Sequence, residues 1–167
     1  MNKRKIYLYS GLAIVFFSAW IFTDSNKKNE DFSETVKVAL REVGSQLLTS
    51  DLDTTSLVLP VIEIQQFKYK LSFQNQLSFE PSNLVSIVEN SFKKVNLPSF
   101  YRAEVVQCSD EEVAYSYQMS AEKEHTIIPC AGRYLPVACY NIELKFTNMR
   151  TPLFSKHLLL LVLLSIL

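Results

Sequence analysis

The three cysteines are the residues of this chain whose type and spacing most suggest chemistry. Cys108 ends a predicted strand, whereas Cys130 and Cys139 enclose eight residues that include Gly132 and Pro136, both able to turn the chain. In an oxidising compartment neighbouring cysteines tend to pair, and we expect a Cys130–Cys139 disulfide, although three cysteines permit three single pairings. Buried thiols and a redox or metal site are the alternatives, but the spacing matches no standard zinc pattern.

The other reactive side chains are not arranged as a catalytic site. His125 has no partner at metal-ligand spacing, and His157 lies beside an apolar segment. The acidic residues at 110–112, together with Glu122 and Glu124, fall in predicted loops and are expected to be solvated surface. The sequence contains no nucleophile-elbow, zinc-protease or glycine-rich phosphate motif. We therefore expect no catalytic, cofactor-binding or metal-binding residues, and no enzyme activity.

Charge argues against nucleic acid as a direct partner. Between residues 24 and 150, 13 Lys and Arg stand against 17 Asp and Glu, which leaves a net charge of −4. Because binding to DNA or RNA depends on neutralising phosphates, direct nucleic-acid binding by this chain is not expected. Hydrophobic residues make up 48% of the chain and charged residues 20%, which suits the packed core of one domain.

The first part of the chain predicts a transmembrane helix. Residues 6–22 are uncharged, and as a helix they would extend about 25 Å, close to the ~30 Å hydrocarbon core of a bilayer. A basic N-terminus at residues 1–5 precedes them, which places it in the cytoplasm by the positive-inside rule. A cleaved signal peptide is the main alternative, but no small-x-small cleavage site follows. We expect a transmembrane helix at 6–23 and an extracytoplasmic domain at 24–150.

The last part of the chain is also apolar. Residues 158–167 are nearly all leucine or another aliphatic residue, which gives about 15 Å of helix, half a bilayer. We interpret residues 151–167 as the start of an incomplete second transmembrane helix; a short apolar tail that packs on the domain or dips into the membrane interface is the alternative. The expected location is the cytoplasmic (inner) membrane, with the domain facing the periplasm.

Two amphipathic helices are predicted between these ends. Asp31 and Glu34 have the spacing of a capping box, and apolar residues then recur at helical spacing to about Leu48. Pro81 marks the first turn of a second helix, whose apolar residues recur to Val95.

Alternating apolar and polar residues predict five strands, at residues 56–64, 67–73, 102–108, 113–119 and 140–146. Pro60 in the first strand requires an edge position or a bulge. In the second strand, every other residue from Phe67 to Phe73 should be buried, while Lys68 and Lys70 should be exposed. The order of elements predicts an α+β fold, a two-layer sandwich of an antiparallel sheet of about five strands and two helices, with an N-terminal transmembrane helix.

Four stretches of the sequence carry a further signal: TSLVLPV (55–61), FEPSNLVSIVENSF (79–92), VVQC (105–108) and IIPCAGRYLPVACYNIELKF (127–146). They resemble a bacterial family of membrane-bound winged helix-turn-helix transcriptional regulators. The resemblance covers roughly residues 31–146, in their extracytoplasmic region. It implies an N-terminal span, a sensor domain, a second span and a cytoplasmic DNA-binding domain, and the present sequence departs from that pattern by halting within the second span.

The expected function is therefore the extracytoplasmic sensory or input domain of a membrane-anchored signal-transduction protein, a transcriptional regulator without its DNA-binding domain here. A membrane-anchored periplasmic binding or assembly module is the alternative. The expected partners are the lipid bilayer and an unidentified small-molecule or protein signal, and a homodimer is an open alternative. Arg133 is the candidate contact for a ligand or partner, with a structural salt bridge or the capping of carbonyls as its alternative roles.

Overall fold

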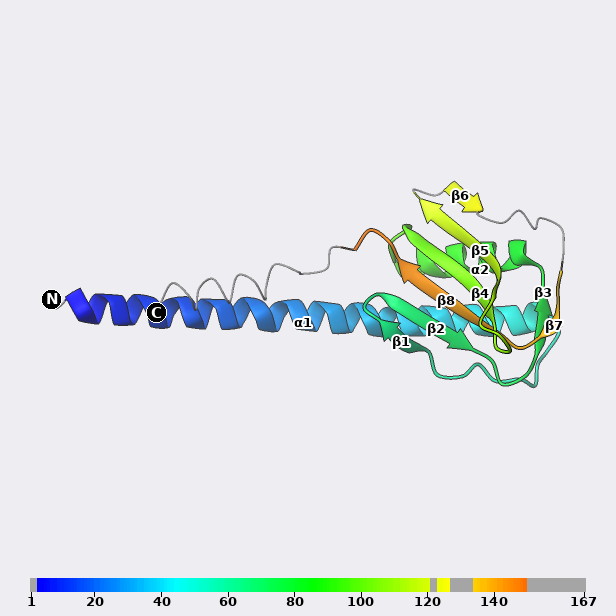
Figure 1. Ribbon diagram of the computed structural model, residues 1–167, viewed down its shortest axis with the longest axis horizontal. Coiled ribbons are helices and arrows are strands. Elements are labelled where there is room, and N and C mark those ends of the chain that lie inside the picture. Colours follow the sequence, from blue (N-terminus) through cyan, green and yellow to red (C-terminus); the bar gives the residue numbers. More distant parts are fainter. Residues whose placement is uncertain (1–2, 121–122, 127–133, 150–167) are drawn as a thin grey trace.

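The computed structural model describes residues 3–120, 123–126 and 134–149, with side chains described at Tyr9, from residue 28 to 120 and from 134 to 149. It shows one long helix that runs into a compact domain (Figure 1). The elements in chain order are α1 (Lys3–Ser50), β1 (Ile62–Gln65), β2 (Lys68–Ser72), β3 (Leu77–Phe79), α2 (Pro81–Lys94), β4 (Tyr101–Gln107), β5 (Val113–Ser120), β6 (Lys123–Thr126), β7 (Leu135–Ala138) and β8 (Tyr140–Phe146).

α1 is a single helix of 48 residues, so the predicted helix start at Asp31 is wrong. Residues 24–30 contain neither Gly nor Pro, and nothing in them interrupts helical hydrogen bonding. Asp31 instead lies inside the helix, where its backbone carbonyl accepts a hydrogen bond of 2.8 Å from the Thr35 hydroxyl. The helical backbone therefore continues without a break from the predicted transmembrane segment into the domain.

The main sheet has six antiparallel strands in the order β1-β2-β8-β4-β5-β6. The predicted α+β class, with an antiparallel sheet of about five strands and two helices, is confirmed, and β6 adds a short edge strand. In β2, Tyr69 and Leu71 are fully buried, which confirms the predicted register. Lys68 and Lys70 are half-buried rather than exposed, and Lys68 forms an ion pair of 2.5 Å with Glu143 of the neighbouring β8.

Other parts of the sheet differ from the prediction. β1 begins only at Ile62, so Pro60 lies outside it and its missing N–H removes no ladder hydrogen bond. Val58 makes an isolated bridge to Phe73. β3 and β7 form a separate two-stranded sheet that the sequence did not predict, because three or four residues are too few to establish a period of two.

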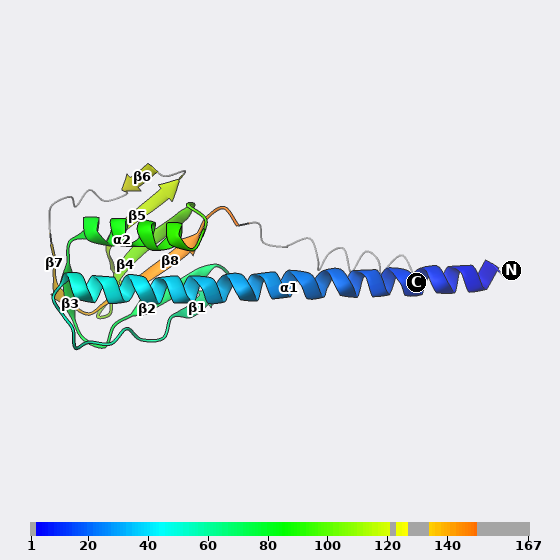
Figure 2. The ribbon, with the colours of Figure 1, turned by 180° about the vertical axis from the view of Figure 1, so that it is seen from behind.

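The second half of α1 and the whole of α2 cover one face of the sheet side by side (Figure 2). α1 approaches closely at Gly44, because a Cβ there would lie 2.9 Å from both Val58 γ-carbons. The predicted α2, with Pro81 at its first turn, is confirmed. Its buried apolar residues, and those of α1, recur at helical spacing and pack on the sheet: Val36, Ala39, Leu40, Val43, Leu47, Leu84, Val85, Val88 and Phe92.

The predicted membrane segments fall largely outside the described part of the molecule. Among the residues that the structure describes, no helix is both long and apolar enough to cross a membrane. The side chains of 10–27 and all of 150–167 lie outside those residues, so the predicted spans at 6–23 and 151–167 stay predictions.

Candidate functional site where both chain segments leave the domain

The disulfide joins a different pair of cysteines from the predicted one. Cys108 and Cys139 are bonded, with their Cα atoms 5.4 Å apart, so the predicted Cys130–Cys139 pairing is wrong. β4 and β8 are neighbours in the sheet, and Cys108 follows the end of one while Cys139 precedes the start of the other. The Cys108 N–H also donates to the Cys139 carbonyl at 3.0 Å. Both residues are exposed, and the bond closes one end of the sheet.

Most of the remaining residues singled out from the sequence lie outside the part of the chain whose side chains are described. Cys130, Arg133 and His157 lie outside the described residues, and His125 lies on β6, whose side chains are not described. The residues that the structure describes contain no group of three or more His, Cys, Asp or Glu that could hold a metal ion.

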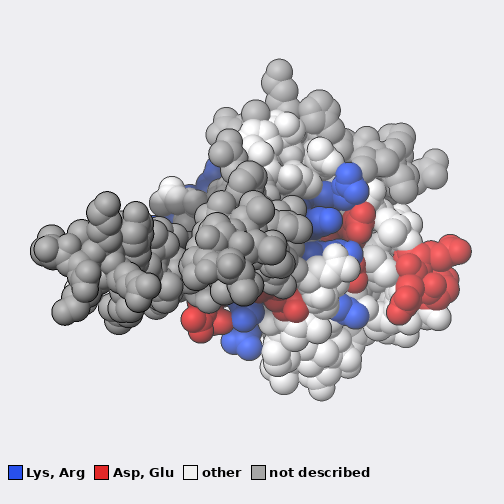
Figure 3. All heavy atoms as spheres, turned by 60° about the vertical axis from the view of Figure 1, so that its left-hand side comes forward, with Lys and Arg blue, Asp and Glu red and all other residues white. Residues whose placement is uncertain are grey.

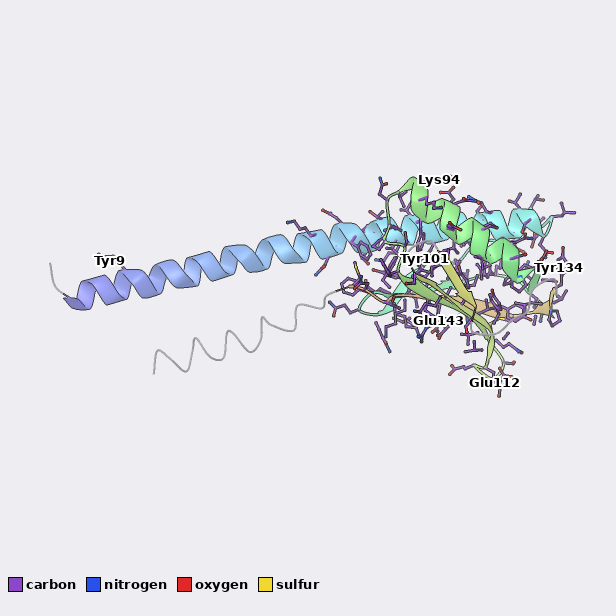
Figure 4. The ribbon with its side chains drawn as sticks, turned by 90° about the horizontal axis from the view of Figure 1, so that it is seen from above. Tyr9, Lys94, Tyr101, Glu112, Tyr134 and Glu143 are labelled. Atoms are coloured by element: carbon purple, nitrogen blue, oxygen red, sulfur yellow. A yellow bond between two sulfur atoms is a disulfide. The ribbon has the colours of Figure 1, made fainter. Side chains whose placement is uncertain are left out.

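The acidic residues at 110–112 form the turn between β4 and β5. All three are exposed, and Glu112 projects from the tip of this hairpin (Figure 4). The Asp110 carboxylate accepts a hydrogen bond of 3.0 Å from the Glu112 N–H, and Glu111 has a φ of 60°. These residues therefore shape the turn and are solvated, as the sequence predicted.

The opposite end of the sheet is where α1 enters the domain and where the chain leaves β8, and aromatic rings pack there. The Phe32 ring of α1 lies 5.9 Å from that of Phe67, in the β1–β2 turn, and 5.2 Å from that of Phe146, the last residue of β8, edge to face in both cases. Phe146 also stacks on Phe92 of α2 at 5.6 Å. We call Phe32, Phe67 and Phe146 the aromatic joint; it ties the incoming helix to the outgoing strand.

Phe67 holds an unusual backbone conformation within this joint. Its φ is 61°, in the left-handed region that is costly for a bulky residue. Its N–H donates to the Glu63 carboxylate at 3.0 Å, and its carbonyl accepts from the Phe146 N–H at 3.0 Å. The hydrogen bonds on both sides, together with the ring contact to Phe32, stabilise this conformation.

Glu63 links α1 to the β1–β2 hairpin. Besides the Phe67 N–H, its carboxylate accepts a hydrogen bond of 2.7 Å from the Ser33 hydroxyl, and Ser33 is buried on α1. Burial raises the pKa of the adjacent Tyr69 phenol; the nearby Ser33 hydroxyl opposes this rise and the Glu63 charge adds to it. The phenol therefore stays neutral near pH 7.

A groove of about 290 Å³ lies over this hydrogen-bond network. Its Glu34 carboxylate is paired with Lys37 at 2.9 Å, and its Glu63 carboxylate is engaged as described. The groove is lined by side chains of α1 and of the β1–β2 hairpin: Asn29, Glu30, Ser33, Glu34, Lys37, Glu63, Gln66 and Phe67.

Sequence reasoning missed the aromatic joint. Phe67 was assigned to a strand, and Phe32 was only one of several apolar positions on a helix. Gln65 and Gln66, which separate the two predicted strands, were the available signal, since a turn there brings the next residue to the sheet end. Comparisons with protein-family models, with curated proteins and with solved structures found no match.

Proposed function

We propose that this chain provides the extracytoplasmic input domain of a membrane-anchored signal-transduction protein, and that the domain faces the periplasm. By its resemblance, the protein would be a transcriptional regulator of the winged helix-turn-helix type. A sensor of this kind needs a folded domain whose structural state can be passed to the segments that connect it to the membrane.

The observation that carries the proposal is that both connecting segments leave the domain together. α1 enters at the aromatic joint, and β8 ends there, with Phe32 and Phe146 in ring contact at 5.2 Å. Figure 1 shows α1 extending from the end of the domain at which β8 finishes. This arrangement suits a domain held between two membrane segments, because both must reach the same bilayer.

The continuity of α1 supports coupling between the domain and the predicted transmembrane segment. Its second half contributes Val36, Leu40, Val43 and Leu47 to the core, and its first half carries the predicted transmembrane segment. Since no turn separates the two halves, a change in how the helix packs in the domain would displace its first half as well. The exposed Cys108–Cys139 disulfide suits an oxidising compartment such as the periplasm.

Reporter fusions test the topology on which the proposal depends. Alkaline phosphatase fused after Thr147 should be active, whereas a cytoplasmic reporter fused at the same residue should be inactive. The fusion protein should also remain with the membranes after an alkaline carbonate wash. An inactive phosphatase with an active cytoplasmic reporter would contradict the proposal, and so would release of the chain by the wash.

A further inference from the structure

Three basic residues lie directly opposite one another across three neighbouring strands. Lys68 of β2 is in register with Lys145 of β8, and Lys145 is in register with Arg102 of β4. The residues next to them on the same strands are buried under the helices, as Tyr69 and Leu144 are. Because side chains alternate along a strand, the three basic side chains share the open face of the sheet. We call them the basic row.

The domain neutralises the basic row only in part. Like charges directly opposite one another destabilise a sheet. Lys68 is paired with Glu143 at 2.5 Å, while Arg102 donates to the neutral Gln118 amide at 3.2 Å. Lys145 is exposed, and the structure gives it no ion pair with any residue that it describes. Two of the three positive charges therefore face solvent without a carboxylate partner among the described residues.

The basic row lies at the end of the sheet that carries the aromatic joint. Lys68 follows Phe67, and Lys145 precedes Phe146, so the row borders the aromatic joint. Figure 3 views the molecule with this end brought forward; blue side chains lie there beside the grey atoms with red ones among them, and a separate red group lies at the right-hand edge. The acidic turn at 110–112 lies beyond the other end of β4.

We propose that the basic row docks on the anionic phospholipid headgroups of the membrane in which the chain is anchored; this inference rests on the proposed function. The charges are complementary, and the acidic turn at the far end would be repelled by the same surface. The domain as a whole is acidic, with a net charge of −4 over residues 24–150, so the row would fix which part of it approaches the bilayer.

The length of α1 allows this approach. About nine residues separate the predicted end of the membrane helix at Thr23 from Phe32, which corresponds to roughly 14 Å of helix. The headgroup layer occupies about 5–8 Å of that distance. The remaining gap is within the reach of a Lys or Arg side chain combined with a Debye length of about 8 Å at physiological ionic strength.

Lysine footprinting of the full chain in liposomes tests the proposal. The chain is reconstituted in phosphatidylcholine alone or with added phosphatidylglycerol, and acetylation of each lysine by a membrane-impermeant reagent is followed by mass spectrometry. Lys94, exposed on α2 in the other layer, is the internal reference (Figure 4). Relative to Lys94, Lys145 should react about fivefold more slowly with phosphatidylglycerol present, as expected for about 1 kcal/mol per basic residue near an anionic surface.

Two variants and two solution conditions sharpen the result. Arg102→Gln should reduce the protection of Lys145, whereas Lys93→Gln on α2 should leave it unchanged. High salt should abolish the protection. Equal protection in Arg102→Gln and the unaltered chain would overturn the proposal. So would equal slowing of Lys94 and Lys145, or protection by inorganic phosphate in phosphatidylcholine alone that matches the effect of phosphatidylglycerol.

The same preparation separates this inference from the proposed function. If the chain fails to float with the liposomes after a carbonate wash, the membrane anchor itself is refuted. If the chain stays inserted but Lys145 reacts equally in both lipid compositions, only the docking inference is refuted.

Discussion

The two ends of the sheet are closed by different means. At one end, the aromatic joint of Phe32, Phe67 and Phe146 connects α1 to β8 by ring packing and backbone hydrogen bonds. At the other end, the Cys108–Cys139 bond joins β4 to β8 covalently. A packed joint can shift between arrangements at modest cost, whereas a covalent bond holds its ends together in every folded arrangement. The difference places adjustable contacts where the chain leaves the domain and a fixed crosslink where it does not.

Truncation of the packed end should have the largest effect. Phe146 is buried and its ring contacts those of Phe32, Tyr69, Phe92 and Tyr101. Phe146→Ala should lower the free energy of unfolding by about 3–5 kcal/mol, because it removes a buried ring and leaves a cavity. Chemical denaturation of the full chain in detergent measures the change.

The matched substitution at the other end is Tyr134→Ala. Tyr134 is 68% exposed beside β7, and its loss should change the free energy of unfolding by no more than about 0.5 kcal/mol. If the two substitutions proved equally damaging, the packed joint would not be the main noncovalent attachment of the outgoing strand.

Removal of the crosslink should have the next largest effect. The bonded cysteines are 31 residues apart, and the chain-entropy model gives about 3–4 kcal/mol for a loop of that size. The double variant Cys108→Ser, Cys139→Ser should lose this amount, and a reductant should then have no further effect. Cys130→Ser is the control and should retain full stability under oxidising conditions. Equal losses in the control and the double variant would show that Cys130 takes part in the stabilising bond.

The hydrogen bonds of Glu63 should contribute less to the free energy of unfolding than the disulfide does. Glu63→Ala removes the acceptor of both the Ser33 hydroxyl and the Phe67 N–H, and should cost about 1–3 kcal/mol because two donors lose their partner. Glu30→Ala, which alters an exposed carboxylate of the same groove, is the control and should be nearly neutral. Thermal unfolding of both variants measures the contrast, and a neutral Glu63→Ala would mean that ring packing alone holds Phe67 in place.

Acid should have the smallest effect on the free energy of unfolding, and it should act through Asp53 in the loop after α1. Hydrogen bonds from Ser56 and then Thr55 hold the pKa of Asp53 well below its usual range. Because the pKa is lower in the folded chain, this carboxylate stabilises the fold above about pH 4 and loses its contribution as pH falls further. Asp53→Asn should flatten the dependence of unfolding free energy on pH between about 4 and 2. Glu30→Gln, as a control, should leave the slope as it is in the unaltered chain.

The regular elements were predictable because their side chains alternate clearly. Tyr140–Phe146 matches the predicted last strand, and Pro81 begins α2 as expected. The disulfide was not predictable, because it depends on strand order: only when β4 and β8 are neighbours does Cys108 meet Cys139. The aromatic joint was missed because it depends on the positive φ of Phe67, which no glycine signals and which three contacts from other elements maintain.

Because α1 is one continuous helix, it also fixes the rotation of the domain about the helix axis relative to whatever holds the first half of the helix. Its 48 residues form a helix roughly 72 Å long, in which each residue advances about 1.5 Å along the axis and turns by about 100°. One residue added between positions 24 and 30 would rotate the whole sheet by more than a quarter turn about the helix axis, relative to the first half of α1. Seven added residues would return the sheet almost to its starting angle. Torque applied to the domain would likewise reach the far end of the helix as rotation, with no loop in between to absorb it.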